Sequence, residues 1–325
     1  MSKTLTKIIS LVILAALIIV LSTIITKKRV IVIENTPANY TTNASSIFGD
    51  PALANNIENQ QINAIFLGIP GAGNSAPNLT DTLMILSINN ETGKGFLLSI
   101  PRDLLVRVPG KNFYTKINSL YQEGGIDSVK TILREISGLD FDYDFVIDLK
   151  GVEKIIDKLD GIDIFVENEI YDPAFPGSNN SYELFRLEKG QHHLDGETAV
   201  KYIRTRHDPT GDFARMRHQQ QILLALQDKI SSLNPLWNSA TILSLWQISA
   251  EHFKTNLSIE NIKSAWEMLK NIDLDKLEFH VLDQASELVI PDHTILGGQT
   301  AYILRPKNGL NNYSEIKDYI NNLIK

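Results

Sequence analysis

The sequence predicts an α/β fold in which helices pack against a central sheet. From residue 62 onwards, short runs of apolar residues alternate with longer segments in which apolar residues recur at helical spacing. Such alternation of strands and helices is typical of layered α/β proteins. Because the connections between these segments are short, we expect a single domain over residues 61–325.

The composition fits a globular protein and narrows the possible functions. Of the 325 residues, 43% are hydrophobic and 21% are charged, and the formal net charge is −7. This charge argues against a general nucleic-acid binder, which usually carries a broad basic excess. Cysteine is absent, which excludes disulfides, thiolate zinc sites and cysteine nucleophiles. Any anion-binding site must therefore depend on a local concentration of basic residues.

The first sixty residues predict a membrane anchor followed by a stalk. Residues 8–26 contain no charge and, as a helix, would cover roughly the hydrocarbon thickness of a bilayer. A cleaved signal peptide usually has a shorter apolar region and a small-residue cleavage site, so we expect a retained transmembrane anchor. Residues 1–7 would be a cytoplasmic end, and the polar residues 27–60 a stalk. Basic residues on both sides of the anchor leave its orientation open.

The first half of the domain predicts mainly strands. Two of its expected strands are joined by the segment Asn89–Lys94, whose Asn, Thr and Gly residues favour a hairpin. A helix is expected over 127–137, where four aliphatic residues share one face. The other expected elements are strands at 62–67, 82–88, 95–100, 141–148 and 162–166, and a helix at 151–159.

The second half predicts mainly helices. Asp195 is a candidate N-cap for a helix that runs to about Arg204, and Asp212 for a longer helix from Phe213 to about Ser231. The remaining expected elements are helices at 240–253 and 259–271, strands at 278–282 and 301–304, and a terminal helix from residue 313.

The segment 204–219 concentrates basic residues in an otherwise acidic chain. It holds four arginines and two histidines against two aspartates. A helix N-terminus with nearby guanidinium groups is a good phosphate site. The alternative is a solvated face with local Asp–Arg pairs. We favour anion binding, because the cations gather around one predicted helix start, where Arg215 and Gln219 share a helical face.

Three further positions add to this hypothesis. Arg102 lies at the end of a predicted strand, where α/β proteins commonly bind ligands. Lys116 follows in a polar loop, and Asp81 could bind a hard cation such as Mg²⁺. Each also has an ordinary explanation: Arg102 could pair with Asp103, Lys116 could be a surface lysine, and Asp81 could end a turn.

Taken together, these ordered segments resemble the LytR–CpsA–Psr family over essentially the whole chain. The matching segments are Phe66–Gly68, Thr80–Met84, Leu98–Leu104, Lys116–Asn118, Asp148–Gly151, Leu159–Asp163, Leu194–Ala199 and the arginine-rich segment 204–219. The resemblance implies a layered α-β-α sandwich around a central mixed sheet, held outside the cell by a single-pass membrane anchor. It also implies an apolar groove for a polyprenyl chain.

The activity implied by the resemblance is phosphotransfer. The enzyme would move a phosphate-linked glycopolymer from a polyprenyl-pyrophosphate carrier to a peptidoglycan hydroxyl, with Mg²⁺ or another divalent cation as cofactor. The implied pyrophosphate ligands are Arg102, Lys116, Arg204, Arg206, Arg215 and Gln219. The implied catalytic residues are Arg102, Asp103, Arg206 and Arg215, with Asp81 as metal ligand and Asp212 as a supporting group.

The sequence departs from the family pattern at three positions. Pro70 stands where members commonly have Asp, Leu79 where they often have Arg, and His218 where a further Arg is frequent. The departures motivate a second hypothesis, a non-catalytic, membrane-tethered receptor for polyprenyl phosphates or anionic glycopolymers. A third is a pyrophosphatase that acts on the same lipids. The glycine-rich segment 68–73 either cradles phosphate or is a flexible loop. A DNA-binding regulator fits poorly, since no helix-turn-helix pattern is found.

Overall fold

The computed structural model describes residues 61–89, 92, 94–177, 181–208, 210–233, 238–257 and 277–324. The predicted cytoplasmic end, anchor and stalk, and the helix expected at 259–271, lie outside these residues. Within the described ranges, no helix is both long and apolar enough to cross a bilayer.

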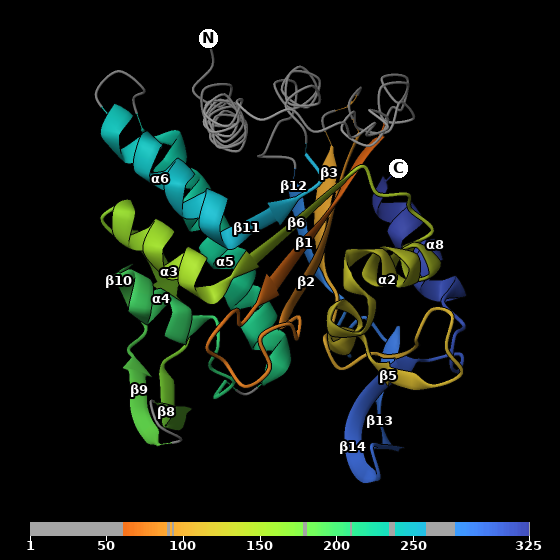
Figure 1. Ribbon diagram of the computed structural model, residues 1–325. Helices are drawn as coiled ribbons and strands as arrows, with labels where there is room; N and C mark the ends of the chain where they lie inside the picture. Colours follow the sequence, from red (N-terminus) through yellow and green to blue (C-terminus); the bar gives the residue numbers. More distant parts are fainter. Residues whose placement is uncertain are drawn as a thin grey trace, which may run out of the picture.

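The centre of the fold is a six-stranded mixed sheet (Figure 1). In spatial order its strands are β11 (Phe253–Thr255), β6 (Tyr143–Asp148), β1 (Gln61–Ile69), β2 (Thr82–Asn89), β3 (Gly95–Ser99) and β12 (Leu277–Val281). Strand β2 is antiparallel to both β1 and β3, whereas β6 runs parallel to β1 and β12 parallel to β3. As a result, β1 and β3 end at the edge of the sheet where β2 begins.

Helices cover both faces of this sheet, with α2 and α8 on one side and α3, α5 and α6 on the other (Figure 1). Their bounds are α2 (Leu120–Ser137), α3 (Leu149–Lys158), α4 (Gly196–Tyr202), α5 (Asp212–Ser231), α6 (Ser239–His252) and α8 (Ser314–Ile324), with a 3₁₀ turn, η4 (Ile117–Ser119), before α2. The mixed sheet and its flanking helices confirm the predicted α/β class.

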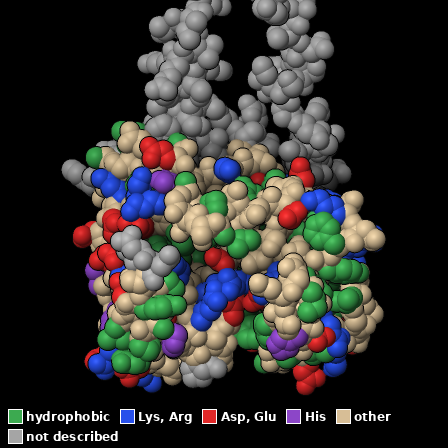
Figure 2. Space-filling model, turned by 60° about the horizontal axis from the view of Figure 1, so that its bottom comes forward, with side chains coloured by type: hydrophobic (Ala, Val, Ile, Leu, Met, Phe, Trp, Pro, Cys, Tyr) green, Lys and Arg blue, Asp and Glu red, His purple; other side chains and the backbone are tan. Residues whose placement is uncertain are grey.

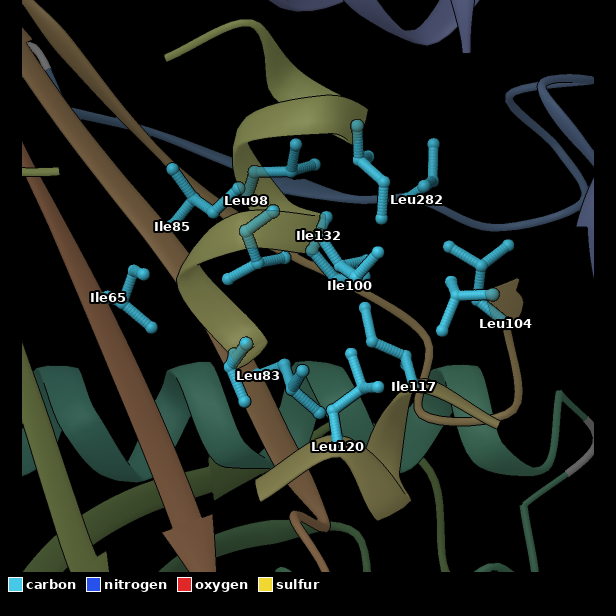
Figure 3. Packing of buried hydrophobic residues seen from close by; sticks show 14 of the residues in the cluster. Ile65, Leu83, Ile85, Leu98, Ile100, Leu104, Ile117, Leu120, Ile132 and Leu282 are labelled. Carbon is cyan, nitrogen blue, oxygen red and sulfur yellow. The ribbon is translucent and has the colours of Figure 1, made fainter. Parts of the chain in front are cut away.

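The largest apolar core lies between the sheet and α2. Figure 3 shows Ile65, Ile85 and Leu98 of the first three strands beside Ile132 of α2. These four side chains are at most 2% exposed, and burying each of them fully contributes roughly 1.5–3 kcal/mol. Strand β1 is buried almost continuously along its length. Such continuous burial is expected of a central strand covered on both faces.

Four two-stranded sheets lie outside the central sheet. They are β4 (Leu105–Arg107) with β5 (Tyr114–Lys116), β7 (Ile162–Val166) with β10 (Gly190–Leu194), β8 (Ile170–Pro176) with β9 (Tyr182–Leu187), and β13 (Val289–Leu296) with β14 (Gln299–Pro306). The pairs β8–β9 and β13–β14 project from the same end of the molecule, toward which the β1 arrow points (Figure 1). They therefore flank the edge at which β1 and β3 end.

The structure corrects several sequence-based expectations. Asp212 is the first residue of α5 rather than its cap, because the N-cap is Gly211 and no side chain caps this helix. Strand 162–166 pairs with β10 outside the central sheet. Helix α2 begins before residue 127, with a kink at Gly124 and Gly125. By contrast, Asp195 caps α4 as predicted, since its carboxylate accepts a hydrogen bond from the Thr198 backbone at 2.8 Å.

Candidate active site

Asp81 and Arg102 meet at the edge where β2 begins and β3 ends. Asp81 directly precedes β2, and its backbone N–H donates to the Gly68 carbonyl at 2.9 Å. Arg102 follows β3 after a short turn, and its guanidinium lies 2.5 Å from the Asp81 carboxylate. The antiparallel pairing of β2 with β3 therefore creates this ion pair between residues twenty-one positions apart.

Helix α5 brings two more side chains to Asp81. Arg215 donates to the Asp81 backbone carbonyl at 3.3 Å, and Gln219 donates to the same oxygen at 3.4 Å. One nitrogen of Arg215 also lies 3.8 Å from the Asp81 carboxylate. Residues four apart share a helical face, which explains why both side chains reach one peptide group.

Asp212 joins three arginines from three chain segments. Its Oδ1 atom lies 2.8 Å from Arg215, 3.5 Å from Nε of Arg102 and 3.5 Å from Nε of Arg206. Arg102 follows β3, Arg206 lies in the loop after α4, and Arg215 belongs to α5. The three guanidinium groups therefore converge on a single carboxylate.

The segment Lys116–Asn118 holds residues of the same cluster in position. Lys116 Nζ lies 2.6 Å from the carboxylate of Asp103, which itself lies 3.9 Å from Arg102. The Asn118 backbone N–H donates to the Arg102 carbonyl at 3.3 Å. The Asn118 carbonyl in turn accepts from the Thr80 N–H at 2.9 Å, which fixes the residue before Asp81.

Burial and the neighbouring charges shift the pKa values of the three arginines. The Arg215 side chain is 3% exposed, and burial lowers the pKa of its guanidinium to about 10. Burial likewise lowers the pKa of Arg206, with the nearby charge of Arg102 adding to the effect. Burial also acts to lower the pKa of Arg102, but the three surrounding carboxylates outweigh it and raise that pKa. All three arginines are therefore charged at neutral pH.

The cluster retains capacity for an anion. It contains four cations against three carboxylates, a formal excess of one positive charge; they are Arg102, Lys116, Arg206 and Arg215 against Asp81, Asp103 and Asp212. The buried Nε–H groups of Arg102 and Arg215 make no hydrogen bond to the part of the chain described. Asp212 is within ion-pair distance of the former, but not in hydrogen-bonding geometry. Buried donors normally have a partner, and a phosphate oxygen would supply one.

Two predicted arginine positions behave differently. The guanidinium carbon of Arg204 lies 5.3 Å from the centre of the Phe175 ring, so this side chain stacks on β8 rather than on Asp212. His218, where a further arginine is frequent in the family, stacks on Tyr202 with ring centres 4.2 Å apart. Burial lowers the pKa of His218 to about 4, so it carries no charge at neutral pH.

The glycine-rich segment after β1 is held by its own hydrogen bonds. Gly71 donates its N–H to the Pro77 carbonyl at 3.0 Å, and the Asn74 amide donates to the Pro70 carbonyl at 2.9 Å. Gly71 has a φ of 80°, and a Cβ atom there would lie 2.6 Å from Cβ of Asp148. Both the positive φ and the close approach of Asp148 require glycine. Backbone conformation and close packing therefore explain why position 71 is a glycine.

The residues present are compatible with one magnesium ion held mainly by a substrate. Among the described residues, no group of three His, Asp or Glu side chains is arranged to hold a metal on its own. Mg²⁺, however, often uses one or two carboxylates together with waters and substrate phosphates. The Asp81 side chain is 35% exposed and lies beside the arginines that would bind the phosphates. Asp81 is therefore the carboxylate best placed to bind such a magnesium ion.

The sequence did not predict that residues near the C-terminus line this site. A cavity of about 340 Å³ lies beside the cluster and is lined by Asp103, Thr210, Gly211, Asp212, Phe213, Gln284, Tyr302 and Leu304. Strand β14 reaches it because the Leu304 N–H donates to the Asp103 carbonyl at 2.9 Å. Figure 2 shows Lys and Arg side chains next to Asp and Glu side chains at the centre of this end, with hydrophobic side chains to either side. No local pattern near residues 284–304 indicated this contact.

Fold and site together define an α/β protein with a partly buried cluster of arginines and carboxylates at one edge of a mixed sheet. The chain belongs to the LytR_cpsA_psr family, whose model matches residues 29–315. The resemblance that the sequence motifs indicated is thereby confirmed.

Individual relatives share less of the chain. Regulatory protein MsrR of Staphylococcus aureus is 35% identical over 46% of this chain and 44% of its own length. The matched part thus spans less than half the length of that relative. Polyisoprenyl-teichoic acid–peptidoglycan teichoic acid transferase TagU of Bacillus cereus is 25% identical over 72% of this chain and 70% of its own. The crystal structure of B. subtilis TagV superposes with a TM-score of 0.61 at 24% identity, covering 82% of this chain and 97% of TagV.

Proposed function

We propose that this protein is a phosphotransferase that moves a phosphate-linked glycopolymer from a polyprenyl-pyrophosphate carrier to a cell-wall hydroxyl. The observation that carries the proposal is the convergence of Arg102, Arg206 and Arg215 on one carboxylate. Family membership and the name of the TagU relative, which includes a polyisoprenyl-linked polymer and peptidoglycan, support it.

The arginine cluster is suited to bind and activate the diphosphate. Arg–phosphate contacts are charge-assisted and often bidentate, and those of Arg102 and Arg215 would use their unpaired Nε–H groups. Fixed cations in a buried site stabilise negative charge that develops on the leaving group. In this reaction the leaving group is the polyprenyl phosphate.

Asp103 is suited to act as the general base. The acceptor hydroxyl attacks the phosphorus attached to the glycopolymer, and its proton passes to the Asp103 carboxylate. The P–O bond to the bridging oxygen breaks, and its electron pair leaves on the polyprenyl phosphate. Lys116, 2.6 Å from Asp103, holds the carboxylate in position. Mg²⁺ at Asp81 would neutralise phosphate charge when it is bound.

The membrane location is part of the same proposal. The charge-free run at residues 8–26 is long enough to anchor the chain. With the folded domain outside the cell, the anchor would keep the site near its lipid-linked donor and raise the donor's effective concentration.

The decisive experiment is a transfer assay on the full chain in nanodiscs. Purified protein is given a polyprenyl-pyrophosphate glycopolymer, Mg²⁺ and peptidoglycan, and both the released polyprenyl phosphate and the wall-linked polymer are measured. We expect both products in equal amounts. Removal of one positioned donor in such sites typically costs about 10²–10³ in rate, so Arg206→Ala should lose transfer to that extent.

The control is Arg134→Ala, an exposed arginine of α2 that pairs with Asp140 rather than with the cluster. It should transfer at the wild-type rate. Binding of the donor lipid without release of polyprenyl phosphate would identify a receptor instead. Release without an acceptor-linked product would identify a pyrophosphatase.

A further inference from the structure

The cavity beside the arginine cluster has a different chemical character from the cluster itself. Its walls come from three chain segments: Asp103 after β3, residues 210–213 at the start of α5, and Gln284, Tyr302 and Leu304 near the C-terminus. Lys and Arg are absent from the described residues that line it. The two carboxylates, Asp103 and Asp212, are therefore its only charged groups among those residues.

The carboxylates of Asp103 and Asp212 are paired with Lys116 at 2.6 Å and Arg215 at 2.8 Å, which do not line the cavity. Because ionised carboxylates are acceptors only, they favour a ligand that donates hydrogen bonds. A phosphate would bind at the arginine cluster rather than in the cavity, because the unpaired Nε–H donors of Arg102 and Arg215 belong to the cluster and no Lys or Arg is among the described residues that line the cavity. Hydroxyl groups, in contrast, can donate to Asp103 and Asp212, and the amide of Gln284 can both donate and accept.

Aromatic and aliphatic side chains complete the cavity. Phe213 and Leu304 form apolar walls, and Tyr302 stands at the mouth with 41% of its surface exposed. The rings of His293 and Tyr302 pack in a T-shaped arrangement, with ring centres 5.7 Å apart at 77°. The Gln284 amide lies 3.5 Å from the Tyr302 hydroxyl. A rigid ring beside a few polar groups is typical of small-molecule sites.

The volume limits the ligand. Pockets for drug-sized molecules usually span about 300–1,000 Å³, so a cavity of about 340 Å³ is at the small end. It has room for a single hexose-sized ring. A neutral, hydroxyl-rich ring with apolar C–H faces matches both the carboxylates and the aromatic walls.

We propose that this cavity is the subsite for one sugar ring of the acceptor glycan, held by Gln284 and Tyr302 with its attacking hydroxyl at Asp103. The proposal rests on the proposed phosphotransferase function. It places the nucleophile next to the diphosphate, since Asp103 lines the cavity and also lies 3.9 Å from Arg102. The hydroxyl proton passes to Asp103 as the new P–O bond forms and the bond to polyprenyl phosphate breaks.

The test separates acceptor from donor. Tyr302→Ala and Gln284→Ala are compared with wild type in the full chain, with a soluble peptidoglycan tetrasaccharide as acceptor. We expect KM for the acceptor to rise about tenfold or more, the effect of losing roughly 1.4 kcal/mol of binding, while KM for the donor stays within twofold. Tyr302→Phe, which keeps the ring, should remain close to wild type.

The matched control is Tyr182→Ala on β9, a tyrosine that is 74% exposed and outside the cavity. It should change neither constant. A rise in donor KM with acceptor KM unchanged would overturn the proposal, because the cavity would then hold the glycopolymer of the donor. Unchanged constants in both cavity variants would overturn it as well.

A binding measurement without turnover distinguishes failure of the acceptor subsite from failure of the proposed phosphotransferase function. Titration of the tetrasaccharide into wild type and Tyr302→Ala, followed by isothermal calorimetry, does not require turnover. Binding by wild type that is lost in Tyr302→Ala supports the subsite even if transfer is absent. Equal binding by both proteins contradicts the subsite even if transfer occurs.

Discussion

Asp212 and Arg215 form an ion pair of 2.8 Å across the first turn of α5, although only 3% of the Arg215 side chain is exposed. A carboxylate is favourable at a helix N-terminus, whereas a cation there is not. Asp212 therefore offsets both the desolvation of Arg215 and its unfavourable position on the helix. Since the same carboxylate also faces Arg102 and Arg206, one residue organises the cationic side of the site.

The first prediction concerns this organising role. Asp212→Asn should lower the free energy of unfolding by about 2–4 kcal/mol, because removing one partner of a buried ion pair leaves the other charge uncompensated. Urea unfolding at neutral pH measures the change. Asp163→Asn, in an exposed pair with His193, should cost less than about 1 kcal/mol. The double variant Asp212→Asn/Arg215→Met should be more stable than Asp212→Asn alone, and a further loss would contradict the argument.

The second prediction concerns the anion capacity of the cluster. Inorganic pyrophosphate should bind and raise the melting temperature, because the buried Nε–H groups of Arg102 and Arg215 make no hydrogen bond within the described chain. A hydrogen bond to a charged group contributes about 1.5–3 kcal/mol, so Arg206→Ala should weaken binding at least tenfold in calorimetry. Arg134→Ala serves as the control and should bind like wild type. Equal affinity in all three proteins would falsify the assignment of Arg206.

The third prediction concerns Mg²⁺. Transfer should stop on addition of EDTA and return with Mg²⁺, and Asp81→Asn should need at least about tenfold more Mg²⁺ for half-maximal rate, because one charged oxygen ligand is lost. The control is Asp140→Asn, whose side chain is 89% exposed in a pair with Arg134. Full activity of wild type in EDTA would contradict the proposed role of Asp81 as a metal ligand.

Local patterns in the sequence predicted the strands and helices that depend on nearby residues, but not the contacts between distant segments. The apolar runs of β1 to β3 and the cap of α4 need only a few neighbours. The placement of Tyr302 beside Asp103 depends instead on a bridge between Leu104 and Leu304, two hundred residues apart in the chain. No periodicity encodes such a contact.

The dependence on contacts between distant segments also explains why the sequence did not show which arginines reach Asp212. Their charge and their gathering around one helix start are visible in the sequence. Which of them reaches Asp212 is decided by tertiary packing, which brings Arg206 to the cluster and stacks Arg204 on Phe175. Likewise, the cap of α5 is Gly211, with a φ of 58°, because the backbone there adopts a conformation that Asp212 would not.

The fourth prediction follows from His218. Burial lowers its pKa from 6.5 to about 4 in the folded protein, whereas in the unfolded chain it should titrate near its ordinary value. Between these two values the unfolded state binds more protons than the folded state, so stability falls as the pH falls. By linkage, this one group should cost about 2 kcal/mol between pH 7 and pH 5.

Urea unfolding of wild type and His218→Gln at both pH values tests this sign and size. The variant should lose less stability than wild type on acidification, by about 2 kcal/mol, because glutamine does not titrate. His193→Gln is the control, since the hydrogen bond that His193 donates to the Asp163 carboxylate raises the pKa of His193 instead. Removing His193 should leave the acid-induced loss in place. An identical pH dependence in wild type and His218→Gln would mean that the pKa of His218 is the same in the folded and unfolded states, which would contradict the prediction.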